Sequence, residues 1–165
     1  MMQHAPRINL ITGGSRGLGR SAALALARAG NDVIITYRTQ ADQAQAVLAQ
    51  IQALGRRAAC VQFDVADPDA LPGFVNALHA QLEKWDAPSV HALVNNAGTA
   101  LYATIAETTP AQFDEMVAVH LRGPYFLTQA LLPLIADGGR ILNISSGLAR
   151  FALPGSSAYA MMKGG

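Results

Sequence analysis

The chain has 165 residues, which is the size of one domain with a buried core, so we treat residues 1–165 as a single domain. Hydrophobic residues make up 51% and charged residues 14%, a composition that excludes an intrinsically disordered chain. The formal net charge is +1 and the two signs are interspersed, so nothing indicates a nucleic-acid partner.

Three features bear on where the protein is located. The first residues contain no apolar signal-peptide core. Residues 87–106 lack Asp, Glu, Lys and Arg, but they include glycine, proline, histidine and asparagine, which a membrane helix tolerates poorly. The one cysteine, Cys60, lies in an apolar run and has no second cysteine with which to form a disulfide or a metal cage. We expect a cytoplasmic, reducing location, no membrane partner and no metal.

Short apolar segments alternate with amphipathic segments along the chain. We predict strands at residues 8–12, 33–37, 58–63, 90–95 and 140–145, and helices at 17–29, 44–54, 68–82 and from 109 onward. Asp67 is the predicted N-cap of the third helix, with Pro68 in its first turn. Gly123-Pro124 predicts a bend in the fourth helix, which Gly138-Gly139 ends. This alternation over short connections predicts right-handed βαβ units and a parallel sheet covered on both faces, a doubly wound α/β fold of the Rossmann type.

A glycine-rich turn follows the first predicted strand. Residues 12–19 read T-G-x-x-x-G-x-G, with glycines at Gly13, Gly17 and Gly19. Such a turn lets the backbone approach a pyrophosphate, whose charge is favoured by the N–H groups at the start of the next helix. The position of the turn favours a dinucleotide site over a simple connecting turn.

The second predicted strand indicates which nicotinamide cofactor binds. An NAD site of this type places Asp or Glu near the end of that strand, whereas this chain has Arg38 there. An arginine forms a charge-assisted fork with a 2′-phosphate, and Arg16 in the glycine turn supplies a second cation. The pattern favours NADP(H); two solvated surface arginines are the alternative.

Small polar residues follow the third and fourth strands, where the ligand crevice of a parallel sheet lies. Asp64 is a candidate to accept from the adenine amino group or, alternatively, a turn residue. Residues 95–98 read N-N-A-G and combine a turn with a cofactor contact. The residues that we predict to bind the cofactor are Thr12, Gly13, Ser15, Arg16, Gly17, Leu18, Gly19, Arg38, Asp64, Val65, Asn95, Asn96, Ala97 and Gly98.

Near the end of the chain, Tyr159 and Lys163 are four residues apart and therefore neighbours on one helical face. An ammonium beside a phenol stabilises the phenolate, so the phenol can exchange a proton with an alcohol or carbonyl oxygen. The pair alone is common by chance and is equally typical of a surface helix. Its context gives it weight.

The order of these motifs, T-G-x-x-x-G-x-G, N-N-A-G, a serine and Y-x-x-x-K, resembles the short-chain dehydrogenase/reductase family from Ile8 to Gly165. The resemblance implies hydride transfer between a nicotinamide and a carbonyl or alcohol carbon. It implies that Tyr159 is the general acid in reduction and the base in oxidation, that Lys163 assists it and holds the nicotinamide ribose, and that Ser146 donates to the substrate oxygen. Ser145 is the neighbouring candidate, but strand alternation turns it the other way.

Two departures from the family pattern matter. The family has an asparagine in the fourth helix that holds a water of the proton relay, and this chain has His120 there. Histidine can also hold a water, and a satisfied core residue is the alternative. Family members also continue well past the position of Gly165, so we expect five strands in the order 3-2-1-4-5, with the C-terminal strands missing and the fifth strand left as a sheet edge.

The leading hypothesis is therefore a C-terminally truncated oxidoreductase that uses NADP(H) on a carbonyl or alcohol substrate, such as a ketone or a 3-oxoacyl thioester. The family implies a homodimer or homotetramer for the complete protein. One alternative is a catalytically impaired NADP(H)-binding module, because the predicted helix of Tyr159 and Lys163 is short without further packing. Another is a structural protein that reuses the fold.

Overall fold

The computed structural model describes residues 7–165, which form a five-stranded parallel sheet with helices on both faces. The strand order is β3-β2-β1-β4-β5, which confirms the predicted order, and all neighbouring strands are parallel. The strands are β1 (Ile8–Ile11), β2 (Asp32–Tyr37), β3 (Ala58–Gln62), β4 (Val90–Asn95) and β5 (Ile135–Asn143).

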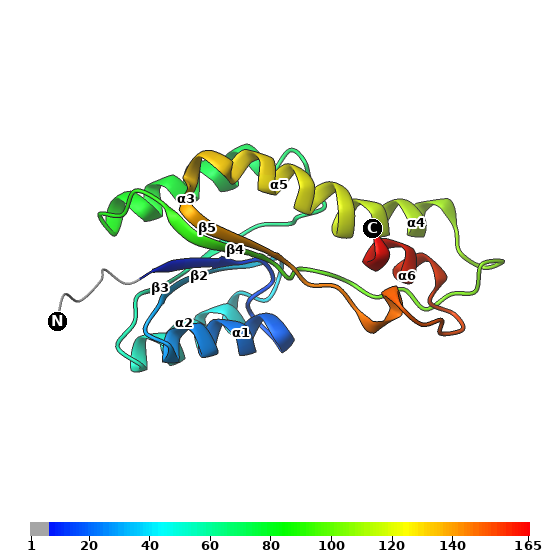
Figure 1. The fold of residues 1–165 in the computed structure, drawn as a ribbon, viewed down its shortest axis with the longest axis horizontal. Helices are drawn as coiled ribbons and strands as arrows, with labels where there is room; N and C mark the ends of the chain where they lie inside the picture. The colour runs from blue at the N-terminus through cyan, green and yellow to red at the C-terminus, as the bar shows by residue number, and fades with distance from the viewer. Residues whose placement is uncertain (1–6) are drawn as a thin grey trace.

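Helices cover both faces of this sheet (Figure 1). α1 (Gly17–Arg28) and α2 (Ala41–Ala53) lie below the sheet in that view, and α3 (Leu71–Lys84) and α5 (Gly123–Leu131) lie above it. α4 (Pro110–Val117) and α6 (Ser157–Gly164) lie beyond the carboxyl ends of the strands, where the C-terminus also lies. Two separate cores result, one on each face, because the strands are apolar on both sides.

The fourth predicted helix is divided by a π-helical turn, Ala118–Arg122, which joins α4 to α5. Thr109 and Gln112 form the predicted capping box at its start, with Pro110 in the first turn. Gly123 and Pro124, where we predicted a bend, follow the π turn directly. Proline has no N–H for the usual helical hydrogen bond, so the change of helical type occurs where that bond cannot form.

Several predicted element boundaries were wrong. The second helix starts at Ala41 and not at residue 44, and the fifth strand ends at Asn143, so Ser145 lies beyond it. α3 begins at Leu71 with Ala70 as its N-cap, because Asp67 instead accepts from the amide of Asp69 and closes a separate turn. β5 begins at Ile135, so the predicted terminator Gly138-Gly139 lies inside the strand. The pairing of β5 with β4 is irregular between Val90 and Ala92, and Gly138 has φ of +73°, so the two glycines accommodate an irregularity within the strand.

At the amino end of the sheet, Asp32 forms a buried ion pair with two arginines. Its carboxylate accepts from Nε of Arg57 at 2.7 Å and from Nη2 of Arg56 at 2.9 Å. Arg57 also donates to the carbonyl oxygen of Trp85 and lies over its ring. The cluster therefore ties β2, the start of β3 and the end of α3 together, on the side of the sheet opposite the predicted site.

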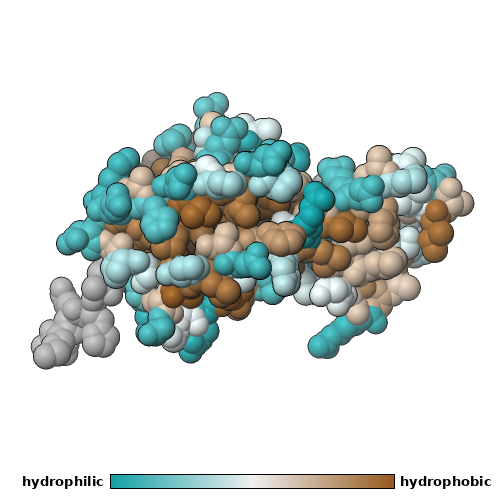
Figure 2. All heavy atoms as spheres, turned by 90° about the horizontal axis from the view of Figure 1, so that it is seen from above, coloured by the Kyte–Doolittle hydropathy of each residue, from teal (hydrophilic) through white to brown (hydrophobic). Residues whose placement is uncertain are grey.

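Part of the surface is apolar. Figure 2 shows hydrophobic atoms on the face formed by α3, α4 and α5. Tyr125 and Phe126 of α5 and Leu132, which follows it, are exposed. Ile141 and Leu142 are also exposed, because β5 is the sheet edge that we predicted. Within residues 7–165, no helix combines the length and the hydropathy that a membrane crossing requires.

Candidate active site

The glycine turn lies between β1 and α1 and is held by the neighbouring strand. The amide of Gly13 donates to the hydroxyl of Thr36 at 3.1 Å, and the amide of Gly14 donates to the carbonyl oxygen of the same residue at 2.9 Å. Gly13 has φ of +65°, a conformation that favours glycine. A Cβ atom on Gly19 would lie 2.3 Å from the carbonyl oxygen of Gly13, so only glycine fits at the start of α1.

A cleft of about 340 Å³ opens beside this turn at the carboxyl ends of the strands. The first helical hydrogen bond of α1 runs from the amide of Arg20 to the carbonyl oxygen of Arg16, so the N–H groups of Gly17, Leu18 and Gly19 have no helical partner. These three residues line the cleft, and free N–H groups at a helix start suit a pyrophosphate by hydrogen bonding and by the helix dipole.

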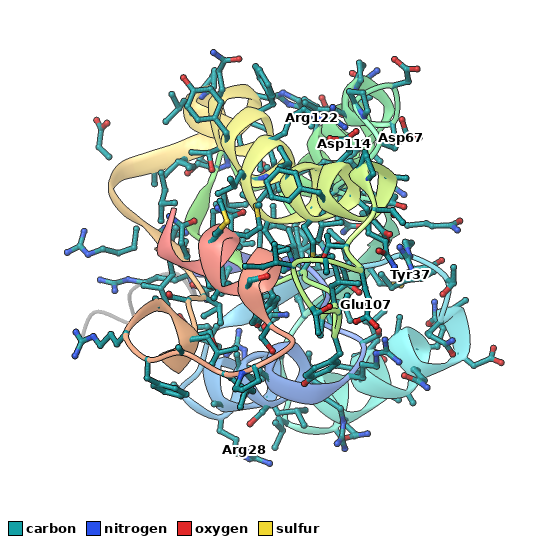
Figure 3. The ribbon with its side chains drawn as sticks, turned by 90° about the vertical axis from the view of Figure 1, so that its right-hand side faces the viewer. Arg28, Tyr37, Asp67, Glu107, Asp114 and Arg122 are labelled. Atoms are coloured by element: carbon teal, nitrogen blue, oxygen red, sulfur yellow. The ribbon has the colours of Figure 1, made fainter. Side chains whose placement is uncertain are left out.

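The polar side of the cleft carries the two predicted arginines. Arg16 and Arg38 both line it, as do Asp64 and Val65, and Tyr37 marks this end of β2 in Figure 3. Arg38 is more than half exposed and lies 3.9 Å from Asp64, so the two side chains form a loose pair rather than a closed ion pair. Asp64 also accepts from the amide of Ala66, a contact that fits its alternative role as a turn residue. The lining of the cleft thus includes two cationic side chains, those of Arg16 and Arg38.

Two predicted cofactor contacts lie behind the cleft and not on its wall. Thr12 is buried, and its hydroxyl accepts from the amides of Asn96 and Ala97 at 3.0 Å. Asn95 is buried too, and its amide donates to the side chain of Asn143 at 2.8 Å. Thr12 therefore holds the start of the loop that follows β4, and Asn95 joins the ends of β4 and β5 through their side chains. The other twelve predicted cofactor residues line the cleft.

Several cleft residues were missed by the sequence analysis. They are Thr36, Tyr37, Thr39, Gln40, Phe63, Thr99 and Val119. Thr36 is the most informative, because its position at the end of the second strand was a recognisable signal for a contact with the glycine turn. Val119 comes from the π turn, whose approach to the cleft no local sequence pattern indicates.

Tyr159 and Lys163 lie on α6, one turn apart as predicted. The Lys163 Nζ atom is 5.8 Å from the centroid of the Tyr159 ring and donates to the carbonyl oxygen of Ile144 at 2.7 Å. Burial lowers the pKa of the Lys163 ammonium from its usual range. Buried Met116 and Met162 pack against Tyr159 and fix α6 on α4. The structure therefore brings the phenol and the ammonium together at the carboxyl end of the sheet.

The two serines after β5 have different partners. The Ser145 hydroxyl donates to the carbonyl oxygen of Lys163 at 2.8 Å. The Ser146 hydroxyl accepts from the amide of Leu148 at 3.2 Å and caps the short 3-10 turn Gly147–Ala149, which packs against α6. Among the described residues, the Ser146 proton has no acceptor, so this hydroxyl can still donate to a ligand.

His120 lies in the π turn, next to the same constellation. Its ring meets the Tyr159 ring edge-on, with centroids 5.5 Å apart, and its Nε2 atom lies 2.8 Å from the carbonyl oxygen of Thr99. His120 and Lys163 also line a second cavity of about 560 Å³, between α5 and the end of β5. Burial, and then the charge of Lys163, lower the pKa of His120, although the contact with Thr99 opposes this.

Residues 7–165 contain no cluster of three His, Cys, Asp or Glu side chains that could hold a metal ion. The chemical groups that the structure brings to this end of the sheet are the Tyr159 phenol, the Lys163 ammonium and the Ser146 hydroxyl, beside the glycine-lined cleft.

Comparisons with known proteins agree with this geometry. A family model described as short chain dehydrogenase matches residues 7–165. The short-chain dehydrogenase/reductase FrzI from a Cladobotryum species is 40% identical over 154 residues, which are 93% of this chain and 58% of FrzI. The chain thus spans about three fifths of the length of the relatives it matches.

Two solved structures are similar in the same way. The landomycin C-6 ketoreductase LanV with bound NADP and rabelomycin matches with a TM-score of 0.92 and 40% identity, over 96% of this chain and 65% of that one. A short chain dehydrogenase from Burkholderia cenocepacia J2315 in complex with NADP matches with a TM-score of 0.86 and 40% identity, over 96% of this chain and 63% of that one. From its motifs, its fold and the family model that covers nearly all of it, the chain belongs to the short-chain dehydrogenase/reductase family.

Proposed function

We propose that the protein is an NADPH-dependent reductase of a ketone or a related carbonyl compound, acting reversibly on the corresponding alcohol. The observation that carries this proposal is the meeting of Tyr159 and Lys163 at the same end of the sheet as the glycine-lined cleft. A proton donor beside a nicotinamide site is what carbonyl reduction requires.

Three side chains would act on the substrate oxygen. Ser146 would donate a hydrogen bond to it, since its proton has no acceptor among the described residues. Tyr159 would deliver the proton to the oxygen as the general acid in reduction and remove it as the base in oxidation. Lys163 would stabilise the phenolate that remains, through a charge that lies 5.8 Å from the centre of the phenol ring.

The cofactor would lie across the cleft, with its pyrophosphate at the start of α1 and its 2′-phosphate between Arg16 and Arg38. When bound, NADPH supplies the hydride that the carbonyl carbon receives. Asp64 and Val65, which follow β3, would contact the adenine end. Two solved relatives hold NADP, which supports this choice of cofactor.

We propose a bulky, largely apolar ketone as the substrate. The loops before α4 and α6 pair through the Ala103 amide and the Gly155 carbonyl oxygen, at 2.9 Å. Exposed apolar side chains project from these loops and from α6; they are Tyr102, Ile105, Phe151, Leu153 and Met161. These exposed apolar side chains suit a substrate whose own apolar surface becomes buried against them on binding. The similarity to LanV, a C-6 ketoreductase, supports a ketone as the substrate.

For the complete protein we propose a homodimer or homotetramer in the cytoplasm. The exposed apolar side chains of α5, such as Tyr125 and Phe126, support an association that would cover them. Size-exclusion chromatography with light scattering on the full-length product of the gene tests this, and a monomer at all concentrations contradicts it.

The function itself is tested by NADPH oxidation with a panel of bulky ketones, quinones and short 3-oxoacyl thioesters. We expect turnover by the full-length product of the gene, faster with NADPH than with NADH, and a thermal shift on NADP binding. If NADP stabilises the protein but no panel member is reduced, the alternative of a catalytically impaired NADP(H)-binding module takes its place. If NADP produces no thermal shift, neither holds, and a structural protein that reuses the fold remains.

A further inference from the structure

We infer that Phe151 is a specificity-determining residue, which selects an aromatic ketone by stacking its phenyl ring on a flat ring of the substrate. The inference rests on the proposed function and deepens it, because it narrows a bulky apolar substrate to one with an aromatic ring close to its carbonyl group. Phe151 has three properties that such a contact requires: its ring is held in place, it lies near Ser146, and it is open to a ligand.

Phe151 ends a short turn that begins at Ser146, between β5 and α6 (Figure 1). The carbonyl oxygen of Ser146 accepts from the amide of Ala149 at 3.1 Å. The carbonyl oxygen of Gly147 accepts from the amides of Arg150 at 2.9 Å and Phe151 at 3.2 Å. These bonds fix the backbone of Phe151 relative to the serine that would donate to the substrate oxygen.

The phenyl ring of Phe151 is held at one edge by Gly147. A Cβ atom at Gly147 would lie 2.5 Å from the Cε1 atom of the ring and 3.0 Å from Cζ, so the ring occupies the space that glycine leaves. Since consecutive Cα atoms are about 3.8 Å apart, this edge of the ring is within about 8 Å of the Ser146 Cα atom. A ketone whose oxygen accepts from Ser146 can therefore place its own ring against Phe151.

The rest of the Phe151 ring is open to a ligand. The residue is 61% exposed, and the aromatic ring pairs within residues 7–165 involve other side chains. A side chain that is already held in place loses little freedom when a ligand binds to it. Aromatic rings also prefer offset-stacked or edge-on aromatic partners, a geometry that a saturated ring does not provide. An aromatic substrate ring therefore gains more from this side chain than a saturated ring of the same size.

A second exposed aromatic side chain lies on the neighbouring loop. Tyr102 is 78% exposed and precedes Ala103, whose amide donates to the carbonyl oxygen of Gly155 at 2.9 Å. The same two loops meet in a parallel bridge between Ala103 and Ser156. The loop of Tyr102 is thereby fixed to the loop of Phe151, and each of the two joined loops carries an exposed aromatic ring. This pairing favours an aromatic substrate over an aliphatic one.

The test compares two ketones that differ only in aromaticity, methyl 2-naphthyl ketone and its fully saturated decalinyl analogue, with NADPH and the full-length product of the gene. The intrinsic reactivities of the two ketones cancel when their kcat/KM ratio in a variant is divided by the ratio in the parent. We expect Phe151→Leu to lower the aromatic-to-saturated ratio about three- to tenfold, the range typical of one aromatic pair. Phe151→Tyr keeps the ring and should stay within about twofold of the parent.

Two further variants complete the set. Gly147→Ala displaces the Phe151 ring without removing it, because the new Cβ atom overlaps the ring edge, and it should lower the ratio in the same direction. Phe126→Leu is the matched control, since it makes the same substitution at an exposed phenylalanine on α5, outside the lining of the cofactor cleft. Its ratio should stay within about twofold of the parent, as expected for a side chain that does not contact the substrate.

An unchanged ratio in Phe151→Leu overturns the inference, as does an equal fall in Phe126→Leu. If the parent protein reduces neither ketone, the proposed function fails by itself. The affinity of the protein with NADP⁺ for methyl 2-naphthyl ketone, measured by saturation-transfer NMR, then decides the role of Phe151 without turnover. A loss of affinity in Phe151→Leu but not in Phe126→Leu supports the inference, whereas equal affinity, or no binding by the parent, overturns it.

Discussion

The Lys163 ammonium donates to the carbonyl oxygen of Ile144 at 2.7 Å, and the amide of Ile144 donates in turn to the carbonyl oxygen of Asn95 at 3.0 Å. α6 is thereby attached to the carboxyl end of the sheet through neutral backbone groups. Since no carboxylate neutralises the ammonium in this contact, its charge remains available to the phenol of Tyr159. Lys163 can therefore hold α6 against the sheet and still stabilise the phenolate of Tyr159.

The two serines after β5 should respond differently to the loss of their hydroxyls. We predict that Ser146→Ala lowers kcat of the full-length protein about 100-fold, because one hydrogen bond to the developing oxyanion is lost. Ser145→Ala removes only the bond to the Lys163 carbonyl oxygen and should lower the free energy of unfolding by about 1 kcal/mol, with kcat within a few fold. Steady-state kinetics and urea denaturation of both variants test this, and a larger kcat loss in Ser145→Ala reverses the assignment.

Arg38→Asp should change the cofactor preference. Loss of the charge-assisted contact and repulsion of the 2′-phosphate should weaken NADP binding about 10-fold or more, with little effect on NAD. The matched control is Arg20→Asp on α1, which changes the charge equally but alters a side chain that pairs with Gln50 away from the cleft lining. Cofactor titrations followed by fluorescence give both dissociation constants. An unchanged NADP-to-NAD ratio in Arg38→Asp means that Arg38 does not bind the phosphate.

Gly19→Ala should disrupt the phosphate loop. The new Cβ atom would lie 2.3 Å from the Gly13 carbonyl oxygen and 2.4 Å from the side-chain amide nitrogen of Asn96, so the loop must shift. We expect NADP affinity to fall at least about 10-fold, since the backbone N–H groups lose their alignment. Gly73→Ala in α3 is the control, because no atom lies within 4 Å of its Cβ position and alanine favours a helix by about 1 kcal/mol. Wild-type affinity in Gly19→Ala would contradict the assigned role of this turn.

Asp32→Asn should destabilise the fold without changing cofactor affinity. Removing one partner of a buried ion pair leaves Arg56 and Arg57 without their counter-charge, at a cost of about 3 kcal/mol. Chemical denaturation measures the loss, and Asp69→Asn, which alters an exposed carboxylate in a turn, is the control. A change below about 0.5 kcal/mol, within the range of ordinary surface substitutions, would show that the cluster contributes little.

The same ion pair makes a prediction for pH. Burial by itself raises the pKa of Asp32, but the hydrogen bonds from Arg57 and Arg56 outweigh it and hold the pKa below its usual range. A lowered native pKa stabilises the fold above the unfolded value of about 3.9, and this contribution is lost as the pH falls through the native pKa. The free energy of unfolding of the parent should therefore fall more steeply below about pH 4 than that of Asp32→Asn.

The sheet could be predicted from the sequence because its strands are nearly continuous apolar runs separated by helices and glycine turns. The boundaries were less predictable where two turns compete: Asp67 caps its own turn with Asp69, so α3 starts at Leu71. Gly138 and Gly139 resembled a terminator because glycine signals a helix end and a strand irregularity equally well.

The motif residues of the cleft could be predicted, but not which of them face the ligand. Thr12 and Asn95 belong to the motifs, yet both point into the packing between neighbouring strands, a direction that depends on register. The contact of His120 with Thr99 joins positions 21 residues apart, and no local periodicity encodes it.

The most direct test of the central claim is the kcat of Tyr159→Phe in the full-length protein, measured with NADPH and a ketone that the parent reduces. The account predicts a loss of about 10²–10⁴-fold, the contribution typical of a general acid, with NADPH affinity within about twofold of the parent. A kcat equal to that of the parent would contradict it, because the reaction would then proceed without the phenol.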